Sequence, residues 1–251
     1  MDDEGVAVGL RGAQGPGSVS GSGSGSVQGS GPVPVGPGAA LFGTWRVGSP
    51  DRQDAAVRAI AAAWGTRRWP GPGLRSYGVL ACDDGETLLH LCQVDEGADE
   101  GAVAEQDPAW EREVDEAVPG IERAGVVAAR LRRSTPVYGA VGDAGCAVLV
   151  TREFDGPDVD RAQGLVEAMF EGGSRTPPAA GMVSAHFYVS TDGSRVFNYA
   201  LWTSAQAHQD AIESRPPELE DDARWKQAHA WPGLLSTTFQ RFRPRLHLVP
   251  G

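Results

Sequence analysis

Two segments of the chain alternate hydrophobic and polar positions on either side of an Asp-Gly pair. They are LRSYGVLACDDGETLLHLCQV, residues 74–94, and MVSAHFYVSTDGSRVFNYALW, residues 182–202. Alternation with a period of two predicts β-strands, and Asp-Gly between two such runs is a strong signal for a hairpin. The second Asp-Gly pair follows the first after 108 positions, so the segments align without a gap. The pattern predicts two equivalent hairpins within an internal repeat.

Helical patterns precede and follow both hairpins. In SPDRQDAAVRAIAAAW, Ser49 can cap a helix, Pro50 suits its first turn, and the apolar residues form one stripe. DVDRAQGLVEAMF has the same pattern before the second hairpin. After the hairpins we expect helices in 106–118 and 203–228, the latter opening with Thr203 and Gln206 at the spacing of a capping box. Further strands are predicted in LFGTWRV (41–47), GVVAARL (125–131), CAVLVTREF (146–154) and LLSTTFQRF (234–242).

The resulting order of elements is β-α-β-β-α-β, twice, which predicts an α+β protein. This order is typical of the ferredoxin-like motif, an antiparallel sheet with both helices on one face. Because the other face of each sheet is uncovered, we expect two tandem units, 41–136 and 146–244, packed sheet to sheet as an intramolecular dimeric α/β barrel. Residues 1–40 contain a Gly/Ser/Pro tract and are predicted to be a disordered tail.

Composition narrows the function classes. The formal charge is −11 and the pI about 4.9, which argues against nucleic acid or an anionic membrane as partner. No apolar run approaches the roughly 20 residues needed to cross a bilayer, and the acidic start MDDEG lacks the features of a secretory signal. Cys82, Cys92 and Cys146 fit reduced thiols better than disulfides or a zinc site, so we expect a cytoplasmic protein without a bound metal.

The strand FNYALW (197–202) carries the candidate chemistry. A turn at Asp192-Gly193 places Asn198 and Trp202 on one helix-covered face, with Ala200 between them. Apolar walls with few polar groups are typical of a small-molecule site, although a hydrogen-bonded amide and a core tryptophan would explain the pair equally well. The predicted opposite pairs are Phe187 with Asn198, Ala185 with Ala200, and Val183 with Trp202.

The second unit resembles the antibiotic biosynthesis monooxygenase (ABM) family of the dimeric α/β-barrel superfamily. The resemblance rests on the turn, on FNYALW and on the continuation TSAQAHQDAIES; a degraded version covers 41–136. It implies a cofactor-independent monooxygenase that uses O₂ to oxidise a polycyclic aromatic, polyketide-type phenol or anthrone to a quinone in antibiotic biosynthesis. In family members with this activity, an Asn four residues before a Trp lines the site, which implicates Asn198 and Trp202.

His208, one turn into the following helix, is the nearest candidate base, or else a capping or surface histidine. Substrate contacts are expected from Val183, Ala185, Phe187 and Ala200. In the first unit His90 replaces the amide and Val94 the indole, so we expect that unit to be a structural partner with a lost or altered site. Two alternatives stay open: a non-catalytic barrel that binds a hydrophobic small molecule or supports a biosynthetic complex, and a haem-binding or haem-degrading protein. The internal pseudo-dimer makes a monomer plausible.

Overall fold

The computed structural model describes residues 26–27, 35–36, 38–70, 73–98, 109–173, 178–214 and 223–251. The strands are β1 (Ser26–Val27), β2 (Ala39–Arg46), β3 (Leu74–Cys82), β4 (Thr87–Val94), β5 (Glu122–Ser134), β6 (Cys146–Phe154), β7 (Met182–Ser190), β8 (Arg195–Trp202) and β9 (Leu234–Val249). The α-helices are α1 (Pro50–Gly65), α3 (Ala109–Ala117), α4 (Val159–Gly173), α5 (Ala205–Glu213) and α7 (Ala223–His229).

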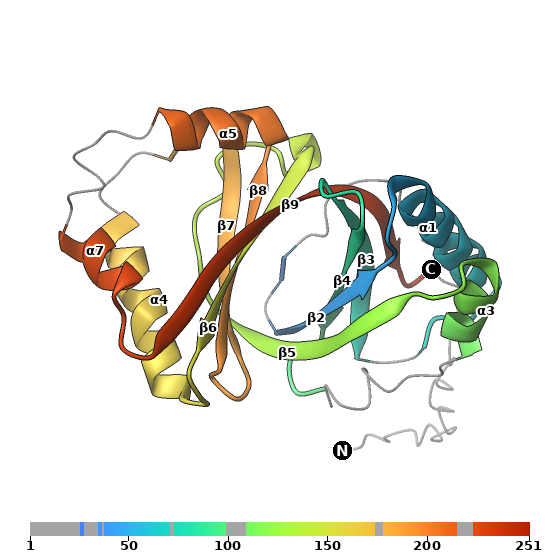
Figure 1. Cartoon of the computed structure of the whole chain (residues 1–251), viewed down its shortest axis with the longest axis horizontal. Helices are drawn as coiled ribbons and strands as arrows, with labels where there is room; N and C mark the ends of the chain where they lie inside the picture. The colour runs from blue at the N-terminus through green and yellow to red at the C-terminus, as the bar shows by residue number, and fades with distance from the viewer. Residues whose placement is uncertain are drawn as a thin grey trace, which may run out of the picture.

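The long strands form one closed antiparallel barrel. Their order is β9-β3-β4-β2-β5-β7-β8-β6, and β6 pairs again with β9 to close the circle (Figure 1). The order within each half is the same, β3-β4-β2-β5 and β7-β8-β6-β9. The halves are joined by hydrogen-bonded pairs, β5 with β7 and β9 with β3. The two sheets therefore do more than pack face to face, because they are also continuous at both edges.

Two layers of core follow from strand alternation. Side chains that point into the barrel form a cluster shared by both halves, which includes Ala40, Phe42, Leu80, Leu89, Leu91, Tyr188, Phe197, Tyr199, Leu201 and Phe242. The alternate side chains face helices on the outside of the barrel. Helices α1 and α3 cover the first half, and α4, α5 and α7 lie against the second (Figure 1).

The two hairpins are equivalent in detail. Gly85 and Gly193 both adopt positive φ, 78° and 73°, as an Asp-Gly turn requires. Each hairpin contains one irregularity in its pairing, between Leu74 and Ser76 in the first and between Met182 and Ser184 in the second. These positions differ by the same 108 residues that separate the Asp-Gly pairs, so the internal repeat includes the bulge.

The bulge changes one predicted pair. Phe187 lies opposite Asn198 and Ala185 opposite Ala200, which confirms the register expected from the turn. Beyond the bulge, however, Met182 and not Val183 lies opposite Trp202, so that prediction is wrong. An extra residue in one strand reverses the face of the side chains that follow it, and Val183 packs inside the barrel.

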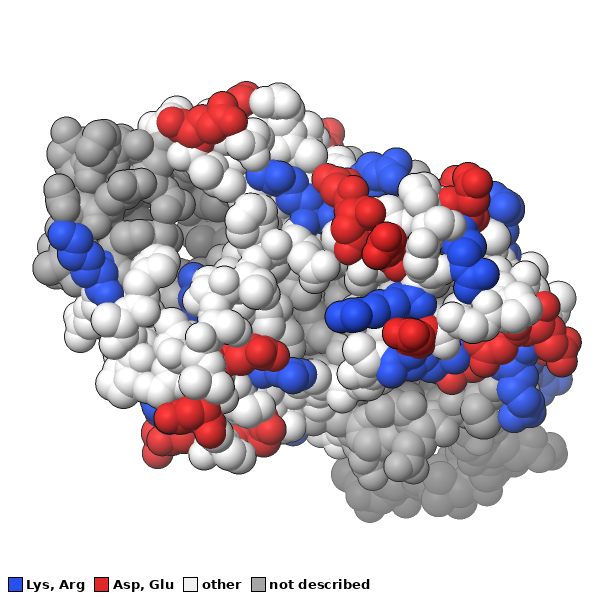
Figure 2. All heavy atoms as spheres, in the orientation of Figure 1, with Lys and Arg blue, Asp and Glu red and all other residues white. Residues whose placement is uncertain are grey.

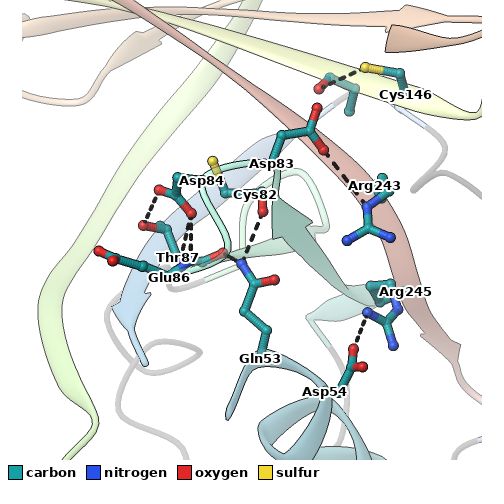
Figure 3. Close-up of polar contacts among 11 residues, drawn as sticks. Gln53, Asp54, Cys82, Asp83, Asp84, Glu86, Thr87, Cys146, Arg243 and Arg245 are labelled. Carbon is teal, nitrogen blue, oxygen red and sulfur yellow. Dashed lines mark hydrogen bonds and ion pairs between the residues drawn. The ribbon is translucent and has the colours of Figure 1, made fainter. Parts of the chain in front are cut away.

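Helix α1 is tied to the first hairpin and to β9. The Gln53 amide nitrogen donates to the carbonyl oxygens of Cys82, at 3.0 Å, and Thr87, at 2.8 Å (Figure 3). Arg245 of β9 pairs with Asp54 at 2.6 Å, and Arg243 with Asp83 of the turn at 3.7 Å. The C-terminal part of β9 thus belongs structurally to the first half.

Element ends agree with the sequence in one place and differ in others. Ser49 caps α1 as predicted, since its hydroxyl accepts from the Arg52 amide. Helix α5 is capped by Ser204, not Thr203, and the described residues of the predicted span 203–228 form α5 and most of α7, separated by 215–222, which the structure does not describe. Of the predicted disordered tail, Ser26–Val27 pair with β9 as β1 and β2 begins at Ala39. The structure also describes 35–36 and 38 there, and the rest of 1–40 lies outside the described residues.

The outer surface mixes both signs of charge. Figure 2 shows acidic and basic side chains interspersed on the visible face, with no single basic patch. Among the described helices, none has the length and apolar character that crossing a membrane demands.

Candidate functional site

The candidate site lies on the outer, helix-covered face of β8. One cluster joins buried residues of α4 and α7 with Ala185, Phe187, Ala200 and Trp202. Asn198 lies on the same face of β8, because it is two positions from Ala200 and four from Trp202 along the strand. The structure therefore brings together the predicted residues of this face, except Val183. Val183 lies on the opposite side of the sheet, because of the bulge described above.

Asn198 and Trp202 each carry a buried polar atom that the protein does not satisfy. Asn198 Oδ1 and Trp202 Nε1 have no hydrogen-bond partner among the residues that the structure describes. A buried polar group without a hydrogen-bond partner costs about 1–3 kcal/mol of stability. Most buried polar groups in native proteins therefore have a partner. Four positions apart on one strand, the two residues are separated by roughly 13 Å. An acceptor and a donor on one face of one strand suit a flat molecule that carries polar groups at both ends.

His208 packs directly on Trp202. The ring centroids are 4.9 Å apart with an edge-to-face angle of 70°, and His208 also contacts the Phe239 ring at 5.7 Å. Ser204, immediately after β8, caps α5 by accepting from the Ala207 amide at 3.0 Å. The tight strand-to-helix passage places the first turns of α5, and with them His208, over the end of β8.

Arg241 of β9 fixes the histidine ring. Its Nε donates to His208 Nδ1 at 2.9 Å, and its terminal nitrogen donates to the Gln209 side-chain oxygen. An imidazole nitrogen that accepts a hydrogen bond carries no proton, so the neutral ring has its proton on Nε2. In this arrangement the neutral His208 ring can donate a hydrogen bond through Nε2.

Sequence reasoning missed Arg241. In LLSTTFQRF, alternation puts Phe239 and Arg241 on one face, and the structure pairs Arg241 with Val148 of the helix-facing cluster. The alternation itself could have identified the face of Arg241. Its partner His208, 33 residues earlier, could not have been identified without the fold.

Arg152 is a second cation that sequence reasoning missed. Arg152 lies on β6 opposite Val196, and Val150, two positions earlier, lies opposite Asn198. Arg152 is therefore on the same face of the sheet as Asn198. Its side chain is buried, and its Nη1 has no hydrogen-bond partner among the described residues. Burial lowers the pKa of Arg152 to about 10, so the group keeps its charge at neutral pH. The face around Asn198 therefore contains a buried positive charge.

The first half has different side chains at the same places. His90 lies opposite Val79, as Asn198 lies opposite Phe187, and Ala128 occupies the position on β5 that Arg241 occupies on β9. Val94 stands where the second half has Trp202. At the positions equivalent to Asn198, Trp202 and Arg241, the first half therefore has no amide, no indole and no guanidinium.

No family model matches the chain, and no curated protein matches it. Solved structures do. An anthrone oxidase-like protein superposes with a TM-score of 0.59, at 14% sequence identity, over 88% of this chain and 95% of its own.

Two further structures show the same barrel. A candidate monooxygenase from Fusobacterium nucleatum gives a TM-score of 0.53 at 7% identity, over 86% of this chain and 96% of its own. Another from Lactobacillus acidophilus gives 0.51 at 11% identity, over 83% and 95%. At these identities the likeness establishes the fold. The resemblance to ABM-like monooxygenases that the sequence predicted is confirmed at that level.

Proposed function

We propose that the chain is a cofactor-independent monooxygenase that oxidises a polycyclic phenol or anthrone to a quinone. In this proposal 41–136 and 146–244 are two ferredoxin-like units of one barrel, and the second unit carries the site. The proposal rests on two buried atoms, Asn198 Oδ1 and Trp202 Nε1, which have no hydrogen-bond partner in the described part of the chain and lie near the His208–Arg241 hydrogen bond. The shared fold with an anthrone oxidase-like protein supports it.

The reaction needs no external reductant. An anthrone that has ionised, its ring-carbon proton having passed to solvent before the site closes, can pass one electron to O₂, and the substrate radical and superoxide then combine to a peroxide at the ring carbon. Loss of water leaves the quinone carbonyl, so one oxygen atom enters the product and the other leaves as water. The four electrons released by the ring carbon reduce O₂ completely, and the protein has to orient the substrate, stabilise its anion and exclude bulk water.

The side chains have distinct tasks in this scheme. Asn198 Oδ1 accepts from a substrate hydroxyl, and Trp202 Nε1 donates to an oxygen at the other end of the ring system. His208 donates from Nε2 to the developing oxyanion while Arg241 holds its ring. The buried charge of Arg152, on the same face, favours the substrate anion. Ala185 and Ala200 are small apolar side chains over which a flat ring would lie, and Phe187 provides an apolar wall.

The test is anthrone oxidation by the purified full chain in air-saturated buffer, without added metal, flavin or haem. We expect quinone formation above the buffer rate with one O₂ consumed for each quinone. Asn198→Ala and Trp202→Phe should each lower the rate by about tenfold or more, since each removes a hydrogen bond to the reacting molecule. Arg195→Ala, at the far end of the same strand, is the matched control and should retain the rate.

A rate equal to the buffer blank across several anthrones and hydroquinones would contradict the proposal. Retained binding of those compounds would then favour the non-catalytic barrel, and a Soret shift on titration with haem would favour the haem reading. The same protein preparation serves all three measurements.

A further inference from the structure

The outer face of the first half holds an aromatic cluster that the proposed reaction does not use. Trp45 stacks on Trp110 with ring centroids 5.6 Å apart and 15° between planes. Trp110 also contacts Trp64 at 5.8 Å and Tyr77 at 6.0 Å. His90 lies 4.1 Å from the Trp45 ring. The Trp110 ring is thus surrounded by three other aromatic rings.

Two nine-tenths-buried side chains of this cluster have polar atoms without partners. Tyr77 Oη and His90 Nδ1 are hydrogen-bonded at 2.5 Å, but His90 Nε2 has no partner among the described residues, and neither has Trp64 Nε1. His90 is 6% exposed and Trp64 7%. Burial, with a smaller contribution from Arg123, lowers the pKa of His90 to about 3, so the ring is neutral at physiological pH. A neutral imidazole can pair with a hydroxyl group.

The sheet beside His90 carries no side chain at Gly43, which is buried. Gly43 of β2 lies between His90 of β4 and Val126 of β5 in the sheet. A methyl group added to Gly43 would make only ordinary contacts, 3.5 Å from His90 Cβ and 3.6 Å from a Val126 methyl. The Val126 side chain is 55% exposed. Phe239, in the equivalent position of the second half, is 51% exposed. The face therefore opens toward solvent at Val126.

We propose that the first half contains a second small-molecule site, for a planar aromatic compound with a hydroxyl group, which the ring of Trp110 occupies in the free protein. The hydroxyl pairs with His90 Nε2, and the ligand ring replaces the Trp110 indole against Trp45 and Trp64. Trp110 is the second residue of α3 and is only partly buried, whereas Trp45, Trp64 and Tyr77 are buried, so Trp110 is the ring of the cluster that a ligand would displace. A pocket filled by a side chain in this way is opened by the ligand that binds it.

Trp110 stacks on Trp45, the ring that His90 contacts, and His90 Nε2 has no partner among the described residues. In the proposed complex the ligand hydroxyl becomes that partner. The exchange preserves the stacking and adds a hydrogen bond. Selectivity for hydroxylated over plain rings should therefore depend on His90, and affinity should depend on how easily Trp110 leaves. This site is independent of the one proposed on β8.

The test uses 2-naphthol and naphthalene as probes with the full chain, measured by isothermal titration calorimetry. Trp110→Ala should bind 2-naphthol about tenfold more tightly than the wild type, because no ring has to be displaced. In the Trp110→Ala protein, His90→Phe should weaken 2-naphthol by about tenfold and leave naphthalene unchanged. Asn198→Leu is the matched second-half control. It should abolish anthrone oxidation and retain both effects, so failure of one site is distinguishable from failure of the other.

An unchanged affinity in a folded Trp110→Ala protein would overturn the proposal, as would equal weakening of both probes by His90→Phe. A second measurement does not depend on variants. Crystals of the wild type soaked in 6-bromo-2-naphthol should show anomalous bromine density beside His90. Density confined to the second half, or none, would equally overturn it.

Discussion

Arg241 Nε donates a 2.9 Å hydrogen bond to Nδ1 of His208, across a gap of 33 residues in sequence. The bond determines which ring nitrogen carries the proton, and so whether His208 acts as a donor or as a base. A single guanidinium on the last strand thereby determines what the first helix turn after β8 can contribute to catalysis.

Arg241→Leu should change the tautomer of His208. Nitrogen-detected NMR of the wild type should show the proton on Nε2, and the variant should show a mixture, because the guanidinium no longer donates to Nδ1. Quinone formation should fall by about tenfold. Arg241→Lys keeps the charge but not the planar geometry, and should recover only part of the rate. A fixed Nε2 proton in Arg241→Leu would show that another contact orients the ring.

Gln53→Leu should destabilise the protein by about 1–3 kcal/mol. The substitution leaves the carbonyl oxygens of Cys82 and Thr87 buried without their donor. Urea denaturation followed by tryptophan fluorescence measures the effect. Arg58→Leu, on the exposed side of the same helix, should stay within about 0.5 kcal/mol. Equal stability of the two variants would mean that water replaces the amide.

The two turn glycines should differ in their tolerance of alanine. Both have positive φ, which costs a residue with a side chain about 1–2 kcal/mol. A Cβ on Gly85 would meet the Pro50 ring at 2.8 Å, whereas one on Gly193 would overlap the backbone of Asp158 and Val159 at the start of α4. Gly193→Ala should therefore lower the melting temperature more than Gly85→Ala. The reverse order would contradict the close approach of α4 to the turn.

Stability should fall as the pH drops below 6.5. The folded pKa of His90 is about 3, against 6.5 for a free histidine, so the unfolded chain binds the extra proton between these values. The contribution of His90 is complete above pH 6.5 and is lost progressively toward pH 3, by about 2 kcal/mol at pH 5. His186, with a pKa of about 4, adds a similar slope. Urea denaturation at pH 7.5 and pH 5 measures the effect. The loss of unfolding free energy between these two pH values should be about 2 kcal/mol smaller in His90→Gln than in the wild type.

The parts of the fold that local chemistry determines could be predicted from the sequence. Asp-Gly between alternating runs gave both hairpins and the pairs Phe187–Asn198 and Ala185–Ala200. The bulge could not be predicted, since nothing at Val183 or at Arg75, its equivalent, marks an extra residue. Thr203 and Ser204 are both good caps, and only the path of the chain decides between them.

The sequence predicted the site residues that the second hairpin and the following helix carry, but not those that come from other strands. Asn198 and Trp202 share a face because strands alternate, which needs no tertiary information. Arg241 and Arg152 reach the same face from β9 and β6, so they become visible only when the barrel closes. The same holds for Trp110, whose contact with Trp45 depends on where α3 comes to lie.

Strand β9 has a consequence for how the protein is made. Its segment from Phe242 to Leu248 is the partner of β3, and β7 is the partner of β5. When the ribosome has released only the first half, both outer strands of that half therefore lack a neighbour and could pair with another nascent chain. The barrel can close only after the segment to Leu248 has left the ribosome, so the first half keeps an unprotected outer strand until then.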